Sequence, residues 1–212
     1  MDSQERNLRN DIVSVCRKLE QKQLIAACDG NVSCRAGNDA ILITPSGLPK
    51  GDLQAEDLIK TTMEGNVIEG ATRPSSEIRM HLLVYQKRPD VFAIVHAHPA
   101  MATAFTLSGF PLNSKVLPEV YLMLGNVPTA PYATPSTPEV PQVIARYVEN
   151  HQAMLLSRHG ALTFGKTVLE AFLRMDKLEH AARTLFFASM LEDRKTPAIL
   201  PESEIRKLEA LK

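Results

Sequence analysis

The fold is decided at residues 91–98, which read Val91-Phe92-Ala93-Ile94-Val95-His96-Ala97-His98. Residues 91–95 are all apolar, and a continuous apolar run of this kind predicts a strand that is buried on both faces of a sheet. His96 and His98 stand at the end of that strand. Since residues two apart in a strand point to the same face, we expect the two imidazoles to be able to bind one ion together.

A second apolar run, at residues 153–156, also leads to a histidine, His159, which is followed by Gly160. If the two strands lie close together in the sheet, three imidazoles converge. Three protein ligands with an open fourth position are typical of a catalytic zinc site. The alternative is that these are buried histidines with ordinary hydrogen-bond partners.

The rest of the chain predicts an α/β protein. Apolar residues at helical spacing predict helices near residues 8–19, 75–87, 138–149 and 167–191. Residues 31–35 and 40–44 predict a hairpin, and residues 61–69 a further strand with a turn in it. Residues 53–59 suggest a brief helix. Seven of the 14 prolines lie within residues 111–141, which predicts a long irregular segment there with short pieces of strand.

Length and charge narrow the class of protein. The 212 residues predict one domain spanning 1–212. Lys+Arg and Asp+Glu both number 24, and this balance argues against a nucleic-acid-binding protein and against a polybasic surface that binds membranes. No apolar run approaches the ~20 residues of a membrane helix, and residues 1–6 lack the apolar core of a signal peptide.

The cysteines indicate a reducing compartment. There are 3 of them, Cys16, Cys28 and Cys34, and an odd, low count is not a disulfide framework. We therefore expect a cytoplasmic protein whose cysteines are small buried residues.

Three short segments are rich in small hydrogen-bond donors: Gly30-Asn31, Ser46-Gly47 and Ser75-Ser76. The third lies at the start of a predicted helix, where free N–H groups favour an anion. Each segment alone is equally typical of a turn or a helix cap. A phosphate site follows only if the three converge near the metal site.

Five motifs occur in a fixed order along the chain: Asp29-Gly30-Asn31-Val32-Ser33, Thr44-Pro45-Ser46-Gly47, Ser75-Ser76-Glu77, His96-Ala97-His98-Pro99 and Arg158-His159-Gly160. In this order they resemble the class II aldolase/adducin family, over about residues 8–191. The segment 131–135 is similar to that family as well. The resemblance implies a three-layer α/β/α sandwich around a mostly antiparallel central sheet. It also implies a homotetramer with active sites between subunits.

The resemblance assigns roles to particular residues. His96, His98 and His159 would hold one zinc ion per chain. Glu77 would be the catalytic acid/base and would also ligate the metal when substrate is absent. Tyr121 would reach into the neighbouring subunit's site and assist proton transfer at the aldehyde. The substrate phosphate would be bound by Asn31, Ser46, Gly47, Ser75 and Ser76.

The implied activity is that of a zinc-dependent aldolase. Such an enzyme reversibly cleaves a small ketose 1-phosphate, such as fuculose 1-phosphate, to dihydroxyacetone phosphate and an aldehyde through a metal-stabilised enediolate. Zinc would act as a Lewis acid, so no lysine Schiff base is needed. The phosphate would supply remote binding energy that positions the reacting carbons. Members of the family that act on fuculose 1-phosphate have a tyrosine in their C-terminal tail. Residues 200–212 of this chain contain no tyrosine, which argues for a ketose other than fuculose.

Other activities occur on the same scaffold. Epimerases of the family carry Asp where Glu77 stands, so Glu77 disfavours that activity. Dehydratases of the methylthioribulose-1-phosphate type and decarboxylases of sugar-acid phosphates share the metal triad and stay open as alternatives. A non-enzymatic, adducin-like structural head is disfavoured because such heads have lost the metal ligands.

Overall fold

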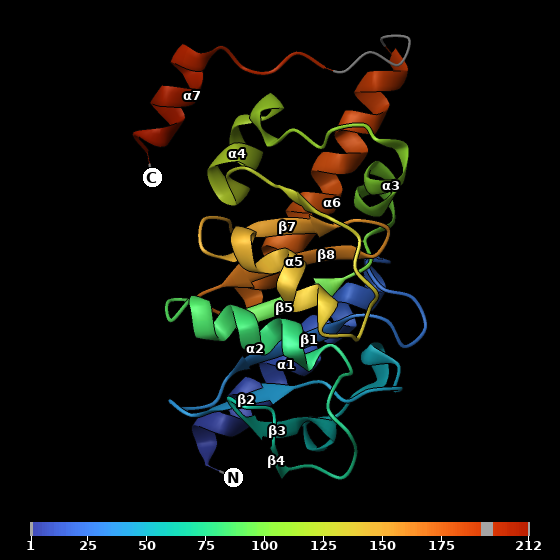
Figure 1. Cartoon of the computed structure of the whole chain (residues 1–212), viewed down its shortest axis with the longest axis vertical. Helices are drawn as coiled ribbons and strands as arrows, with labels where there is room; N and C mark the ends of the chain where they lie inside the picture. The colour runs from blue at the N-terminus through green and yellow to red at the C-terminus, as the bar shows by residue number, and fades with distance from the viewer. Residues whose placement is uncertain (1, 192–196, 212) are drawn as a thin grey trace.

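The structure is a computed structural model that describes residues 2–191 and 197–211. Within these residues an eight-stranded sheet forms the centre, in the order β4-β3-β2-β1-β5-β8-β7-β6 (Figure 1). The strands are β1 (Asn31–Arg35), β2 (Ala40–Ile43), β3 (Ile59–Thr62), β4 (Val67–Glu69), β5 (Ala93–Ala97), β6 (Thr129–Ala130), β7 (Ala153–Leu156) and β8 (Gly160–Gly165). Neighbouring strands pair antiparallel except β6 and β7, so the sheet is mostly antiparallel as expected.

Helices cover both faces of this sheet. They are α1 (Ser3–Gln21), α2 (Ile78–Lys87), α3 (Ala100–Ser108), α4 (Pro118–Leu124), α5 (Glu139–Val148), α6 (Val168–Leu191) and α7 (Glu202–Glu209). Short 3-10 turns occupy Lys50–Asp52, Ala55–Asp57 and Ser114–Val116. None of the described helices is long and apolar enough to cross a membrane.

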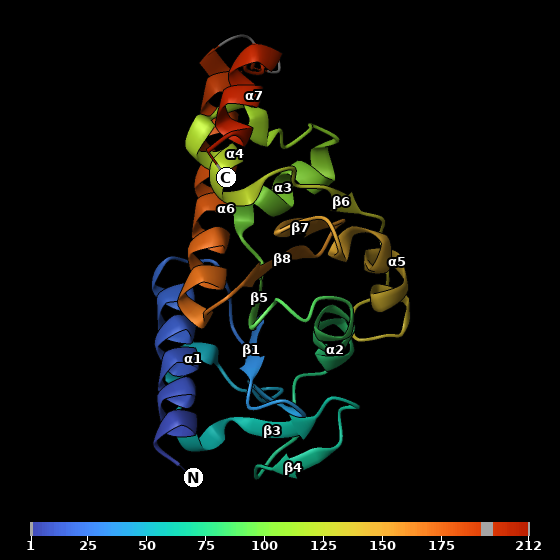
Figure 2. The same ribbon diagram turned by 90° about the vertical axis from the view of Figure 1, so that its left-hand side faces the viewer.

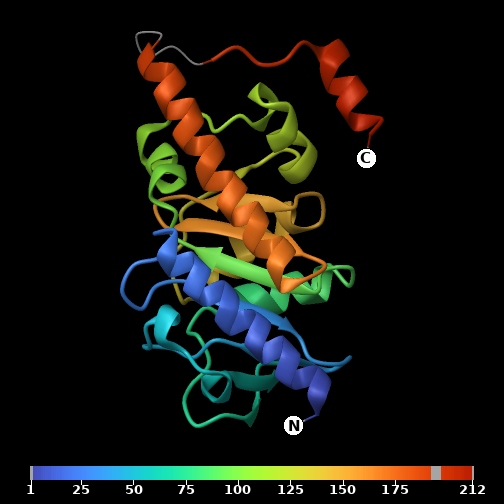
Figure 3. The ribbon, with the colours of Figure 1, turned by 180° about the vertical axis from the view of Figure 1, so that it is seen from behind.

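Alternation along the central strands separates two apolar cores. Val32 and Val95 face one core, which they share with residues of α1, α3, α4 and α6. Ile94 and Phe164 face the other, which they share with α2 and α5. The two helical layers lie on opposite sides of the sheet in Figure 2. Figure 3 shows the molecule from behind, and α1 and α6 lie in front of the sheet in that view. The chain is therefore a mixed α/β protein with a central sheet flanked by helices, as the sequence predicted.

Strand β8 is the main element that we did not predict from the sequence. It lies between β5 and β7, so the two apolar strands that lead into histidines are not neighbours. The glycines at its ends, Gly160 and Gly165, resemble strand breakers. Both are needed because a Cβ atom would collide with other backbone, at the Ala97 carbonyl for Gly160 and at the Ala171 amide for Gly165.

Two further expectations differ from the structure. Residues 118–124 form helix α4 rather than irregular chain, because Pro118 takes the first turn of the helix, where its missing N–H costs nothing. Within residues 53–59 the brief helix is only the 3-10 turn Ala55–Asp57, and β3 begins at Ile59. Among the cysteines, Cys16 and Cys34 are buried, as expected, but Cys28 is exposed.

Candidate metal centre and active-site pocket

Three imidazoles and one carboxylate meet at one end of the central strands. His96 is the fourth residue of β5, His98 lies just beyond that strand, and His159 lies in the turn between β7 and β8. The ring centroids of the three histidines are 4.8–5.0 Å apart. With Glu77, which immediately precedes α2, they offer four ligand atoms that lie within 4.8 Å of one another. The cluster can therefore hold a metal ion.

The turn between β7 and β8 delivers His159 to this cluster. The His159 amide donates to the Leu156 carbonyl (3.1 Å), and Arg158 has a φ of +59°. Because β8 pairs with β5, this turn lies beside the end of β5. A Cβ atom on Gly160 would contact the ring of His98 as well as the backbone of β5, so glycine permits this close approach.

Hydrogen bonds orient two of the imidazoles toward a shared point. Nδ1 of His96 lies 2.9 Å from the carbonyl oxygen of Ala161, which can only accept, so this nitrogen carries the proton. Nδ1 of His98 lies 3.2 Å from Oδ2 of Asp29 and donates in the same way. In the neutral rings both Nε2 atoms are then acceptors, yet they lie 3.1 Å apart. A metal ion between them suits this arrangement, and such outer partners are typical of histidine ligands.

Glu77 closes the cluster. Its Oε2 lies 3.0 Å from Nε2 of His96, and its Oε1 lies 3.3 Å from Nε2 of His159. The side chain is buried, and Oε1 makes no hydrogen bond within the described residues. Burial raises the pKa of the Glu77 carboxyl, but His96, His159 and the amide of Asn31 outweigh it and hold the pKa below its ordinary value. Glu77 is thus an anion at neutral pH, ready to hold a cation or accept a proton.

A buried chain of hydrogen bonds leads away from Glu77 between the sheet and α2. The Asn31 amide donates to Oε2 of Glu77 (3.1 Å), and its carbonyl oxygen accepts from Nε2 of His81 (2.5 Å). Nδ1 of His81 lies 2.7 Å from the Ser33 hydroxyl, which lies 2.7 Å from the Tyr85 hydroxyl. Burial lowers the pKa of His81 to about 3, so the ring is neutral. Its Nδ1 must therefore accept from Ser33, and Tyr85 donates at the far end. Glu77 is therefore held by a network in which the donor and the acceptor of every hydrogen bond are fixed.

A pocket of about 200 Å³ adjoins the metal cluster, and Glu77, His98 and His159 line it. Two chain segments on its wall are joined by backbone hydrogen bonds, from Ser46 to the Arg73 carbonyl (3.0 Å) and from Ser75 to the Thr44 carbonyl (3.1 Å). The structure brings all five residues predicted to bind phosphate to this pocket: Asn31, Ser46, Gly47, Ser75 and Ser76. The three donor-rich segments thus converge beside the histidines.

Tyr121 is the predicted site residue that lies elsewhere in this chain. It is on α4, and its hydroxyl donates to a carboxylate oxygen of Glu209 in α7 (2.6 Å). That hydrogen bond raises the pKa of Tyr121 to about 12. Tyr121 is not among the residues that line the pocket. Its role in a neighbouring subunit stays a prediction.

Sequence reasoning missed several residues around the site. Asp29 stands in one of the quoted motifs, but nothing local to the sequence indicates that its carboxylate faces His98. Ser33 and Tyr85 looked like ordinary strand and helix residues. His81, four residues after Glu77, forms hydrogen bonds with Ser33 and Asn31. Its i, i+4 spacing from Glu77 was the signal that could have revealed the network.

Comparison with known proteins agrees with this geometry. Residues 10–186 match the family described as Class II Aldolase and Adducin N-terminal domain. A protein named L-fuculose phosphate aldolase, from Methanococcus maripaludis, is 32% identical over 182 residues, which cover 86% of this chain and 98% of that protein. A protein named 3-oxo-tetronate 4-phosphate decarboxylase, from Escherichia coli strain CFT073, is 32% identical over 186 residues, which cover 86% of this chain and 87% of that protein.

The fold is found in solved structures as well. The structure of an L-fuculose 1-phosphate aldolase superposes with a TM-score of 0.87 at 30% identity, covering 98% of this chain and 95% of that one. The family match spans most of the chain and includes every motif that contributes to the histidine cluster and the pocket. The chain belongs to the class II aldolase and adducin family.

Proposed function

We propose that this protein is a zinc-dependent lyase that reversibly cleaves a small ketose 1-phosphate to dihydroxyacetone phosphate and an aldehyde. The observation that carries the proposal is the convergence of the histidine cluster and Glu77 with the donor-rich segments in one pocket. A site of this kind can hold a phosphorylated ketone at both ends, with its oxygens at the metal and its phosphate at the serines.

His96, His98 and His159 are the proposed zinc ligands, and Glu77 is a fourth when no substrate is present. Three nitrogen ligands and an open position suit zinc, although ligands of this type accept other divalent metals too. When bound, the ion supplies a Lewis acid for the carbonyl and hydroxyl oxygens of the substrate.

Glu77 is the proposed acid/base. In the synthetic direction its carboxylate takes a proton from C3 of dihydroxyacetone phosphate, and in the cleavage direction it returns that proton. The hydrogen bond from Asn31 fixes the orientation of the carboxylate, and the depressed pKa keeps it ionised. The fixed orientation serves general-base catalysis, which requires the base to lie within hydrogen-bond reach of the proton that it takes.

The phosphate is proposed to bind Asn31, Ser46, Gly47, Ser75 and Ser76. Gly47 has a φ of +76° and no neighbour within 4 Å of the place where a Cβ would lie. Its backbone is therefore open to a ligand. Binding energy from this remote group positions the carbon atoms that react.

Decarboxylation of a 3-oxo sugar-acid phosphate is the second candidate. It is favoured by the relative named 3-oxo-tetronate 4-phosphate decarboxylase, which is as similar to this chain as the named aldolase. Loss of carbon dioxide from that substrate also gives dihydroxyacetone phosphate. In both reactions the electrons of the broken carbon–carbon bond stay on dihydroxyacetone phosphate. The leaving group is an aldehyde in one reaction and carbon dioxide in the other, so the pocket described above serves both.

The protein is further proposed to be a cytoplasmic homotetramer of single-domain chains, with Tyr121 contributing to a neighbour's site. Exposed apolar residues on α6, including Phe187 and Met190, support an interface between chains.

One assay separates the candidates. Dihydroxyacetone phosphate release is measured from the 1-phosphates of fuculose, ribulose, 5-deoxyribulose and methylthioribulose, and from 3-oxo-tetronate 4-phosphate. Zinc-loaded and chelator-treated protein are compared. Chelator-sensitive release with an aldehyde supports the aldolase, and release with carbon dioxide supports the decarboxylase. Absence of release from every substrate by zinc-loaded protein contradicts both, and water loss would be measured next.

Glu77→Gln in the same assay tests the base. We expect this variant to keep its zinc but to lose turnover by about 10²–10⁴-fold. The matched control is Glu64→Gln, at an exposed carboxylate outside the pocket, which should leave turnover unchanged. Turnover of Glu77→Gln within a few-fold of the unsubstituted protein would remove Glu77 from this role.

A further inference from the structure

Lys50 is a buried cation on the wall of the pocket. It is the first residue of the 3-10 turn Lys50–Asp52, and only 2% of its surface is exposed. It lines the pocket together with Ser46 and Gly47, which precede it by four and three residues. Neither the histidine cluster nor the network around Glu77 uses this side chain.

The contacts of the Lys50 ammonium leave its charge without an anionic partner. Nζ donates to the carbonyl oxygens of Cys28 (2.9 Å) and Leu48 (2.7 Å). An ammonium group has three donors, so one remains. No carboxylate oxygen of the described residues lies within 4.0 Å of Nζ, since none of the ion pairs found among them includes Lys50. Burial lowers the pKa of Lys50, while Cys16, Cys28 and Asp29 favour its charged form from farther away.

A buried charge that lacks a partner is costly, and proteins normally pair or neutralise such a group. Lys50 lines the pocket, and so do Ser46, Ser75 and Ser76, whose side chains carry hydroxyl groups. A fixed cation among hydroxyl donors is suited to an anion with several acceptor oxygens. The two carbonyl bonds hold the ammonium where the segment at Cys28 meets the turn at Leu48, so the charge stays at the pocket wall.

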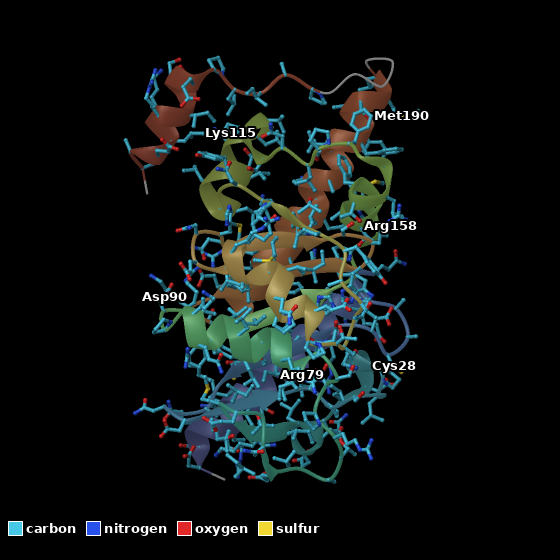
Figure 4. All side chains as sticks on the ribbon, in the orientation of Figure 1. Cys28, Arg79, Asp90, Lys115, Arg158 and Met190 are labelled. Carbon is cyan, nitrogen blue, oxygen red and sulfur yellow. The ribbon has the colours of Figure 1, made fainter. Side chains whose placement is uncertain are left out.

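We propose that Lys50 supplies the positive charge of the phosphate subsite and makes the pocket selective for phosphate monoesters over uncharged sugars. The inference rests on the proposed function, because it concerns the same pocket, and it adds the residue that neutralises the phosphate. Cys28, whose carbonyl anchors Lys50, is labelled on the surface in Figure 4, on the same side of the molecule as Arg158, the residue before His159. Lys50 lines the same pocket as His98 and His159 of the metal cluster.

The test is the binding of inorganic phosphate to the full-length protein, measured by isothermal titration calorimetry. Lys50→Gln removes the charge but keeps an amide with two donors for the carbonyls of Cys28 and Leu48. We expect its dissociation constant for phosphate to rise about tenfold or more, because charge-assisted hydrogen bonds are about twice as strong as neutral ones. Lys22→Gln, at an exposed lysine paired with Asp176, is the matched control and should bind like the unsubstituted protein. Both zinc-loaded and chelator-treated proteins are titrated, so that phosphate bound to metal is recognised.

Three results would overturn the proposal: equal phosphate affinity of Lys50→Gln and the control, loss of the difference in chelator-treated protein, or no phosphate binding by unsubstituted protein. If Lys50→Gln does not fold, the Nζ resonance of Lys50 in the unsubstituted, ¹⁵N-lysine-labelled protein decides. It is assigned with Lys50→Arg, which keeps the charge. A shift that follows phosphate saturation, with Lys22 unmoved, supports the proposal, and an unmoved Lys50 signal overturns it.

This design separates the inference from the proposed function. Phosphate binding that depends on Lys50, with no turnover of any sugar phosphate, would leave the anion subsite standing and reject the lyase. Where a substrate is turned over, Lys50→Gln should raise KM far more than it lowers kcat. A purely structural role of Lys50 would instead reduce zinc content and kcat together.

Discussion

His96 and His98 bring their Nε2 atoms to within 3.1 Å of each other, while each ring directs its Nδ1 proton to another acceptor. Two lone pairs at this distance repel unless a proton or a metal ion lies between them. Without metal, Glu77 favours a proton at this point: burial lowers the pKa of His96, but the neighbouring carboxylate outweighs it and raises the pKa above its ordinary value. Protons and metal therefore compete for one position, and metal affinity should fall as the pH falls.

The outer partner of His98 should control metal affinity. Asp29→Ala removes the carboxylate 3.2 Å from Nδ1 of His98, and loss of such a partner typically weakens binding 10–100-fold. We expect about one zinc per chain in the unsubstituted protein and a dissociation constant for zinc raised by about that factor in the variant. Competition with a chromophoric chelator measures both. The control is Asp176→Ala, which removes a surface ion pair with Lys22. Equal zinc affinity of both variants would contradict the assigned role of Asp29.

His81 should make the free energy of unfolding depend on pH. Its pKa is about 3 in the folded protein because of burial, and about 6.5 in an unfolded chain. Between these values the unfolded state binds the extra proton, so stability is lost as the pH falls from about 6.5 toward 3. The slope from this group is at most about 1.4 kcal/mol per pH unit.

Urea unfolding of the metal-free protein at several pH values measures this effect. His81→Asn should flatten the dependence between about pH 6.5 and 4, while His180→Asn, at an exposed histidine, should not. The same slope in all three proteins would show that His81 is not held neutral by its burial.

Gly160 should be required for the metal site as well as for the strand. A Cβ atom there would overlap the Ala97 carbonyl and contact the ring of His98. Gly160→Ala should cost about 1–3 kcal/mol of unfolding free energy and should also weaken zinc binding, because His98 must move. Gly37→Ala is the control: Gly37 has a φ of +81° and open space around it. That variant should cost about 1–2 kcal/mol through backbone strain alone and keep its zinc affinity. A Gly160→Ala variant with unchanged zinc affinity would refute this coupling.

Tyr121 offers a test of the shared active site. If Tyr121 acts in a neighbour's pocket, each active site combines Glu77 of one chain with Tyr121 of another. Tyr121→Phe and Glu77→Gln then each inactivate the enzyme when present in every chain. Mixing the two variants under conditions that exchange subunits should then restore part of the activity, since some sites combine intact Tyr121 with intact Glu77. Sedimentation velocity should show a species of four chains. A monomer, or no recovery in verified mixed oligomers, would reject this role.

The hydrogen bond between Tyr121 and Glu209 gives a second test of a catalytic role for Tyr121. The Glu209 carboxylate accepts it from the Tyr121 hydroxyl within the same chain. Glu209→Gln weakens this contact and should alter the turnover of an enzyme that uses Tyr121. A parallel change at Glu204, an exposed α7 residue paired with Lys207, serves as the comparison. Identical turnover of both variants would count against a catalytic Tyr121.

Much of the architecture could be predicted from local patterns. The apolar run before His96 predicted a buried strand, and β5 is that strand, with its last residues carrying the histidine. Period-2 and helical spacing likewise predicted β1, β2, α2 and α6, because side-chain direction in strands and helices follows from chain geometry alone. The ordered motifs added the family, and with it the mostly antiparallel sheet.

Long-range pairing decided the rest. Whether His159 reaches His96 depends on β8 entering between β5 and β7, and no local periodicity specifies which strands become neighbours. Which strands pair depends on the burial of both faces of the sheet at once. The requirement for glycine at 160 and 165 likewise comes from backbone of other segments that packs against these positions.

The sequence by itself predicted which residues gather at the site: the histidines and Glu77, which form the cluster, and the donor-rich segments, which line the pocket. Only the tertiary structure decided their electrostatic surroundings. Asp29 orients His98, His81 fixes Asn31, and Lys50 lies buried in the pocket wall without a carboxylate nearby among the described residues. The reason is physical: residue type sets what a group can donate, accept or ligate, but burial and partner distance set its charge and direction, and both arise from contacts between segments far apart in the chain.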